Sequence, residues 1–330
     1  MPDAKTASPL KAAPTPESLA IQQLVSRNEA QSLIADRMRW NVAEAATVPD
    51  REEFWRQLVI ALLTSQQRST VGSPVSQFAN QTTFPLELSR YAGFTDGQVS
   101  GILQSFRFHD RIAGYLRDNH NRLFVNDKGW ANLMLWFQRL AEQRKAPPTG
   151  SQAALERQAA SALAEAMRGV GPKQSRNILQ ELGLTRYEIP LDSRVVGWLC
   201  HNLGWTIKNA ELSRHQTYDA LLDRVQLACA QAGVLPTIFD AAAFTIGGER
   251  STSAARTTVC GFVNQNGQVV IRNSGLPGTD HLQSVYQLGC TICGHVYGAN
   301  GSDIHLRLCP KCQSGATGLP FTGAKHGEAQ

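Results

Sequence analysis

Long hydrophobic runs are missing from this sequence of 330 residues. No apolar run reaches about 18 residues, so no segment is predicted to span a bilayer and no membrane partner is expected. The first residues have no apolar run after a basic start, which speaks against a secretory signal, and their Pro, Ala and Ser content predicts a flexible leader over residues 1–25. We therefore expect a cytoplasmic protein.

Charge of either sign is also modest, because charged residues make up 18% of the chain and the net charge is only +5. This mild basic excess is compatible with a polyanionic partner, but enzymes that act on small molecules share it. Charge by itself does not establish DNA binding.

Cysteines are few outside one region. Three of the seven are scattered, and the other four form two CxxC pairs separated by fifteen residues, namely Cys290, Cys293, Cys309 and Cys312. Four thiolates at this spacing suit a tetrahedral Zn²⁺ ion, which we expect to be structural because no coordination position stays open. His295 and His305 lie in the same region, but the four cysteines already complete the ligand shell.

Apolar residues recur at helical spacing from about Ser26 to Phe244, which predicts a mostly α domain over residues 26–248. Its helices are broken at turn-rich stretches such as Lys145–Gly150 (KAPPTG) and Gly169–Pro172. After a linker at about Ile246–Ala255, residues 256–330 are predicted to form a small β domain of the zinc-ribbon type. Its expected strands are Thr257–Val263 and Gln268–Arg272, joined as a hairpin, and Asp303–Leu308 between the cysteine pairs.

The most informative segment is LAEAMRGVGPKQSRNILQEL, which begins at Leu163. Gly169 and Gly171 flank Val170 and allow a tight turn between two helices, and the next helix starts with a proline, which suits a first helical position. Backbone N–H groups at such a turn, with a helix N-terminus behind them, can hold a phosphate. An ordinary helical turn is the alternative.

Lys173 follows on the first turn of the second helix, where the positive end of the helix dipole disfavours the charged ammonium. Asp192 lies nineteen residues further on, in the segment IPLDSRV, where it is predicted to cap the next helix. Capping is compatible with catalysis, since it holds the carboxylate ionised and oriented.

The pieces MRGVGPK and IPLDSRV resemble the helix-hairpin-helix (HhH-GPD) DNA glycosylases that carry a catalytic lysine, and the 8-oxoguanine DNA glycosylases most closely. The resemblance extends over roughly Glu53–Ala243. It implies a two-lobed helical core in which Lys173 attacks C1′ of a flipped nucleotide and forms a Schiff base, with Asp192 assisting proton transfer. The cysteine spacing differs from that of endonuclease III, so no iron–sulfur cluster is expected.

The same resemblance implies residues that contact DNA or line the base pocket. Gln66, Gln67 and Arg68 stand where relatives wedge side chains into the duplex. The pocket candidates are Asn177, one helical turn after the lysine, and Phe239 and Asp240 in a late helix, although phenylalanine at such spacing is more often a core residue.

We therefore predict a DNA glycosylase with lyase activity on a damaged or modified base, associated with the nucleoid. Two alternatives stay open. One is the same chemistry directed at hypermodified bases of phage DNA. The other is a binding protein that keeps the hairpin and the ribbon without catalysis, although binding alone requires neither Lys173 nor Asp192.

Overall fold

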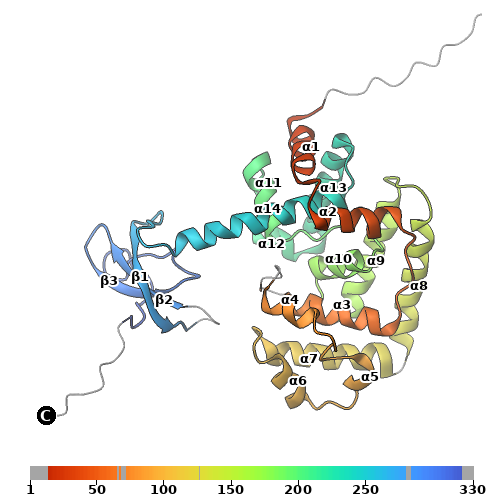
Figure 1. Cartoon of the computed structure of the whole chain (residues 1–330), viewed down its shortest axis with the longest axis horizontal. Helices are drawn as coiled ribbons and strands as arrows, with labels where there is room; N and C mark the ends of the chain where they lie inside the picture. Colours follow the sequence, from red (N-terminus) through yellow and green to blue (C-terminus); the bar gives the residue numbers. More distant parts are fainter. Residues whose placement is uncertain (1–13, 65–66, 68–71, 126, 280–283, 322–330) are drawn as a thin grey trace, which may run out of the picture. The chain divides into compact units, whose positions relative to one another are not determined.

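The computed structural model describes residues 14–64, 67, 72–125, 127–279 and 284–321, with the side chains of residue 209 and residues 246–256 left out. The chain divides into two compact units, Met1–Gly247 and Gly248–Gln330 (Figure 1). The first unit is helical and the second carries a small antiparallel sheet, so the predicted fold class is confirmed. The predicted domain bounds, 26–248 and 256–330, stay predictions.

The helices before the hairpin are α1 (Pro16–Asn28), α2 (Ser32–Arg37), the π-helix η1 (Met38–Ala43), α3 (Arg51–Leu63), α4 (Pro74–Ala79), α5 (Leu88–Tyr91), α6 (Asp96–Leu103), α7 (His109–His120), the π-helix η2 (Asn121–Val125), α8 (Lys128–Arg144) and α9 (Gln152–Ala166). The helices after it are α10 (Pro172–Glu181), α11 (Ser193–Leu203), α12 (Asn209–Ser213), α13 (His215–Ala232) and α14 (Pro236–Thr257). Described residues of the first unit contain no strand, as predicted.

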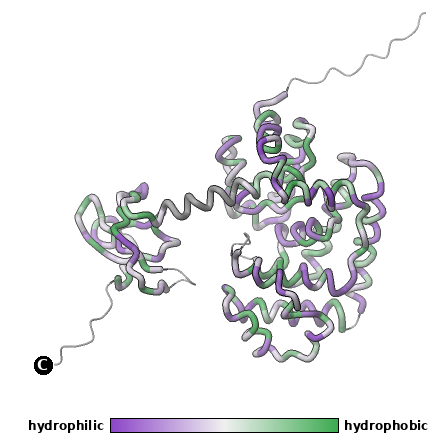
Figure 2. The backbone as a smooth tube through the Cα atoms, viewed as in Figure 1, coloured by the Kyte–Doolittle hydropathy of each residue, from purple (hydrophilic) through white to green (hydrophobic). Residues whose placement is uncertain are grey.

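Two hydrophobic clusters form the core of the first unit. One gathers buried residues from α3 to α10, with Phe54 and Phe137 fully enclosed. The other joins α1 and α2 to α11, α13 and α14. Hydrophobic and hydrophilic segments alternate along these helices (Figure 2), as expected when one face of each helix is buried.

The predicted leader, residues 1–25, is wrong in its second half, because α1 begins at Pro16. Thr15 caps the helix by accepting a hydrogen bond from the Ser18 N–H at 3.1 Å. Ile21 and Leu24 are buried in the second core cluster. The Pro- and Ala-rich composition predicted a flexible segment, whereas packing against the core stabilises a helix there.

The second unit contains a three-stranded antiparallel sheet with strand order β1 (Gln268–Pro277), β2 (Ser284–Cys290) and β3 (Val296–Asn300). The predicted turn before β1 is present, with Gly267 at a φ of +73°. The predicted strand over 257–263 is reduced to a single bridge between Val263 and Val269, because α14 runs on to Thr257 and residues 258–261 form turns. The predicted linker at 246–255 is thus helical backbone.

The predicted strand Asp303–Leu308 is also wrong, because residues 303–306 form turns and residues 307 and 308 belong to no strand. The side-chain amide of Asn264 donates to the carbonyls of Ile304 and Arg307 at 2.7 and 2.9 Å. Asn266 donates to the carbonyl of Leu306 at 3.1 Å. These bonds satisfy carbonyls that a sheet ladder would otherwise use.

No single described helix is long and apolar enough to cross a membrane, and α13 with Pro236–Thr245 passes that test only as a pair bent by 97°.

Candidate active site

The hairpin between α9 and α10 has the predicted form. Gly169 adopts a φ of +80°, and a Cβ at this position would lie 2.3 Å from Cδ2 of Tyr115 in α7. Only glycine fits so close an approach in the left-handed region. Val170 is 6% exposed and packs in the first core cluster, as expected for the residue between the helices.

Asn119 of α7 fastens the hairpin from outside. Its amide oxygen accepts from the Arg168 N–H at 2.7 Å, and its amide nitrogen donates to the Arg168 carbonyl at 2.9 Å. Arg168 also pairs with Asp118 on the same helix. The hairpin is therefore held rigidly before α10 begins at Pro172, directly after the N-cap Gly171.

Lys173 occupies the first turn of α10 and lines a pocket. Burial lowers the pKa of its ammonium, and Arg194 lowers it further, whereas Asp192 and Asp240 act in the opposite direction. The net direction is downward. The fraction of neutral, nucleophilic amine near neutral pH is therefore larger than for a solvated lysine.

Asp192 is the N-cap of α11, as predicted. One oxygen, Oδ1, accepts from the backbone N–H groups of Arg194 and Val195 at 2.8 and 3.0 Å. The other, Oδ2, lies 3.6 Å from Nη1 of Arg194. The guanidinium of Arg194 in turn stacks 3.7 Å from the ring centroid of Phe244. The carboxylate is thus fixed in orientation while its residue still lines the pocket.

The pocket has a volume of about 670 Å³ and is lined by residues from both core clusters' helices. Three predicted site residues, Asn177, Asp192 and Asp240, meet Lys173 there. Within the described residues, the Asn177 side chain has no hydrogen-bond partner. Its amide is available to a molecule in the pocket.

Asp240 is a buried carboxyl in this pocket. Burial raises its pKa to about 7, and the charge of Asp192 adds to the rise, while Arg37 and a hydrogen bond from Gln180 oppose it. The Gln180 amide donates to Oδ2 at 3.0 Å. Asp240 therefore changes between hydrogen-bond donor and acceptor near neutral pH.

Phe239 is wrongly predicted as a pocket residue. It is fully buried, and its ring packs edge-on against Trp198 with 5.2 Å between centroids. Phe244 lines the pocket instead, because it lies one helical turn after Asp240 and shares its face of α14. Phe239, the residue directly before Asp240, faces the core.

The predicted wedge residues lie mostly outside the described residues, which include neither Gln66 nor Arg68. Gln67 is described and is engaged within the protein. Its amide nitrogen donates to the Leu63 carbonyl at 2.9 Å, and its amide oxygen accepts from the Arg107 N–H at 3.2 Å. Its side chain joins the end of α3 to the turn before α7.

Sequence reasoning missed the pocket residues that come from the N-terminal helices. Arg37 of α2 lines the pocket and pairs with Glu181 at the end of α10. Glu53 of α3 also lines it, and burial raises the pKa of its carboxyl. No local motif marks these residues, since they reach the site only through the packing of distant helices.

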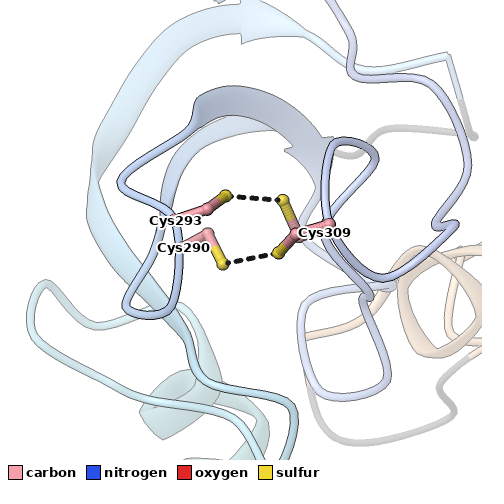
Figure 3. A group of neighbouring side chains, drawn as sticks. Cys290, Cys293 and Cys309 are labelled. Atoms are coloured by element: carbon pink, nitrogen blue, oxygen red, sulfur yellow. Dashed lines mark hydrogen bonds between the residues drawn. The ribbon is translucent and has the colours of Figure 1, made fainter.

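The four cysteines of the second unit gather as predicted, with all ligand atoms within 4.8 Å of one another. The sulfurs of Cys290 and Cys312 are 3.6 Å apart, and those of Cys293 and Cys309 are 3.7 Å apart. Figure 3 shows Cys290 and Cys293 opposite Cys309. Sulfurs about 2.3 Å from a tetrahedral zinc lie about 3.8 Å from each other. The spacing fits a bound zinc and is far longer than a disulfide bond.

Neighbouring groups support the thiolates. The Lys311 N–H donates to the Cys309 sulfur at 3.4 Å, and the Gln268 amide donates to the Cys290 sulfur at 3.7 Å. Gln268 is held in turn by the Tyr297 hydroxyl at 2.9 Å. His295 and His305 are not part of the group. The site thus offers four cysteine sulfurs, two of which accept hydrogen bonds from neighbouring groups, and such an arrangement suits a structural metal.

No protein-family model matches the chain, and no curated protein matches its sequence. Two solved structures of the 8-oxoguanine glycosylase of Methanocaldococcus jannaschii resemble it. The structure in complex with a 15mer DNA containing 8-oxoguanine has a TM-score of 0.48 at 14% identity, and the alignment covers 70% of this chain and 98% of that one. The other has a TM-score of 0.47 at 12% identity, with 70% and 94% covered. At these values the likeness assigns the chain to no family.

Proposed function

We propose that this protein is a DNA glycosylase with lyase activity, in which Lys173 removes a damaged or modified base. The observation that carries the proposal is the meeting of Lys173, with its lowered pKa, and the fixed carboxylate of Asp192 in one pocket. A pocket of about 670 Å³ is within the usual range for small organic ligands, roughly 300–1,000 Å³. A nucleotide base flipped out of the duplex is such a ligand.

The neutral amine of Lys173 attacks C1′ of the target nucleotide. A bond forms between Nζ and C1′, and the glycosidic bond breaks, with its electron pair leaving on the base, which takes up a proton. The new ammonium loses a proton, and the nitrogen lone pair then breaks the bond between C1′ and the ring oxygen O4′. The ring oxygen takes up a proton, and the product is an iminium, the Schiff base. Removal of a C2′ proton then expels the 3′ phosphate by β-elimination.

Asp192 supports these steps in two ways. Its negative charge stabilises the positive charge that develops on the sugar when the base leaves. It also accepts the proton that the attacking amine must lose. Because two backbone N–H groups hold one of its oxygens, the carboxylate needs no rearrangement during the reaction.

The hairpin supplies the grip on DNA. Gly169, Val170 and Gly171 precede the N-terminus of α10, and such a turn offers backbone N–H groups to a phosphate without reading the sequence. Asn177 and Asp240 present an amide and a titrating carboxyl to the edge of the base. These groups suit a base that offers both donors and acceptors, of which 8-oxoguanine is one and a hypermodified base is another.

The second unit is proposed to hold a structural zinc ion through Cys290, Cys293, Cys309 and Cys312. These four cysteines would hold the metal and through it fix the fold of the second unit, and the proposed reaction proceeds in the first unit.

Sodium borohydride trapping tests the proposal. The reagent reduces the Schiff base to a stable amine, so duplexes with 8-oxoguanine, other modified bases or an abasic site should yield a covalent protein–DNA adduct. Lys173→Ala should abolish the adduct, and the exposed Lys145→Ala should leave it unchanged. A Lys173→Ala protein that still forms the adduct, or a wild-type protein that forms none on any duplex, would contradict the proposal. The non-catalytic alternative predicts the second result.

A further inference from the structure

Arg176 lies one helical turn after Lys173 and is completely buried. A buried guanidinium needs partners for all its donors. Its Nη1 donates to the Pro172 carbonyl at 3.0 Å, its Nε to Glu188 at 2.6 Å and its Nη2 to Asp219 at 2.6 Å. These bonds join α10 to the loop before Asp192 and to α13.

The first of these bonds ends beside Lys173. The Pro172 carbonyl belongs to the peptide that leads into Lys173, at the point where the helix starts. The Ser175 hydroxyl donates to the same carbonyl at 3.1 Å, so Arg176 and Ser175 together hold the first turn of α10.

Arg176 is connected to the residues before Asp192 in two ways, through Glu188 and through Tyr218. Glu188 lies four residues before Asp192 and is 0% exposed. The guanidinium also stacks 4.6 Å from the ring centroid of Tyr218, whose hydroxyl accepts from the Leu191 N–H at 2.6 Å. The same hydroxyl lies 3.4 Å from the Ile189 carbonyl, to which it donates. The backbone that enters Asp192 is thus held through Tyr218.

We propose that Arg176 is a positioning residue that sets the distance between Lys173 and Asp192 by binding the chain next to both. This inference rests on the proposed function, since it assigns Arg176 a part in that reaction. Arg176 does not touch the pocket and acts through Pro172, Glu188 and Tyr218. A displacement of about 1 Å between reacting groups costs roughly 10²-fold in rate, so such a clamp affects catalysis without contacting substrate.

The fold does not depend on Arg176 alone. Glu188 retains bonds from Arg157, at 3.0 and 2.9 Å, and from Gln226 at 3.0 Å when Arg176 is changed. Glu156 holds the backbone N–H groups of Arg186, Tyr187 and Glu188 at 2.8 to 3.0 Å. In an Arg176 variant the buried carboxylate of Glu188 therefore still pairs with Arg157. The loop over residues 186–188 keeps its hydrogen bonds to Glu156.

The test compares Arg176→Gln and Arg176→Lys with the wild type in single-turnover borohydride trapping on abasic DNA, across pH. Arg176→Gln should slow adduct formation per folded molecule by roughly 10²-fold. The acid limb of its rate profile should also move to lower pH. Without the bonds from Arg176, Asp192 lies further from Lys173 and raises its pKa less, while the effects of Arg194 and Asp240 on that pKa remain. Arg176→Lys keeps the charge but reaches fewer partners, so its loss should be smaller.

Arg144→Gln is the matched control. Arg144 is also a buried arginine that binds backbone carbonyls, at Gly183 at 3.0 Å and at Trp40 at 2.8 Å, and neither residue lines the pocket. This variant should lose stability but keep the wild-type rate and pH profile per folded molecule. A purely structural role for Arg176 predicts the same result for Arg176→Gln, and that result would overturn the inference.

Tyr218→Phe decides the question if Arg176→Gln does not fold, because it removes only the hydroxyl that binds the backbone of Ile189 and Leu191. Slower trapping and an acid limb at lower pH would support the positioning role, and an unchanged rate and profile would overturn it. If the wild type traps normally and these variants do too, the positioning role fails while the proposed function stands. If the wild type forms no adduct, both fail.

Discussion

Lys173 and Asp192 lie at the N-terminal ends of two different helices and line the same pocket, although they are nineteen residues apart in the sequence. Lys173 lies in the first turn of α10, and Asp192 caps α11. The charge of Asp192 raises the pKa of Lys173 against the larger effect of burial. An amine with a lowered pKa thus shares the pocket with a carboxylate that remains oriented by backbone hydrogen bonds.

Asp192→Asn should slow trapping and shift its pH dependence. Loss of the carboxylate removes proton transfer, which is worth about 10²–10⁴-fold in rate. It also removes the charge that stabilises the developing positive charge on the sugar. The pKa of Lys173 should fall further, because Asp192 no longer raises it. The acid limb of the rate profile should therefore move to lower pH while the plateau drops. Single-turnover trapping from pH 5 to 9 measures both, and an acid limb that moves to higher pH would contradict this account.

Asp240→Asn should change how stability depends on pH. The folded pKa of Asp240, about 7, lies above its ordinary value of 3.8. The folded protein therefore holds a proton that the unfolded chain releases between about pH 4 and 7, so Asp240 makes the wild type less stable as pH rises through that window. The slope is at most about 1.4 kcal/mol per pH unit. The free energy of unfolding in urea should differ less between pH 5 and pH 8 for Asp240→Asn than for the wild type. An equal difference in the two proteins would contradict the raised pKa of Asp240.

Gly169→Ala should destabilise the first unit by about 1–3 kcal/mol. The residue needs a φ of +80°, and the added Cβ would lie 2.3 Å from Tyr115. Gly150→Ala is the control, since it has no atom within 4 Å of the added Cβ and no positive φ. Urea denaturation followed by helical circular dichroism compares the two variants. Equal stabilities would show that the hairpin tolerates a side chain.

Cys309→Ser should abolish metal binding and unfold the second unit, because structural zinc contributes directly to the folding of such a unit. Elemental analysis should find one zinc per wild-type chain and little in this variant. Cys260→Ser is the matched control, since Cys260 lies in the same unit, is exposed and is outside the cluster. Zinc retained at the wild-type level by Cys309→Ser would contradict the proposed site.

Local patterns predicted much of the site. The two glycines, Pro172 and the spacing from Lys173 to Asp192 are short-range features, so the hairpin and the helix starts follow from the sequence. The cysteine pairs likewise specify their own cluster. Periodicity predicted helices but did not indicate which face of α14 meets the pocket. Phe239 was therefore predicted to line the pocket, whereas Phe244 lines it.

Long-range features were not predictable from the sequence in this way. Arg37 reaches the pocket only because α2 packs near the end of α10, and no motif near residue 37 reports that contact. The alternation at Asp303–Leu308 resembled a strand, but Asn264 and Asn266 bind its carbonyls and hold it in turns. In both cases residues far apart in the chain decide the outcome.

Peptide mapping of the borohydride-reduced adduct shows whether Lys173 is the nucleophile. After digestion of DNA and protein, mass spectrometry should find the reduced sugar remnant on the peptide that carries Lys173 and on no other lysine. An adduct on a different residue, or on several lysines at once, would contradict the account.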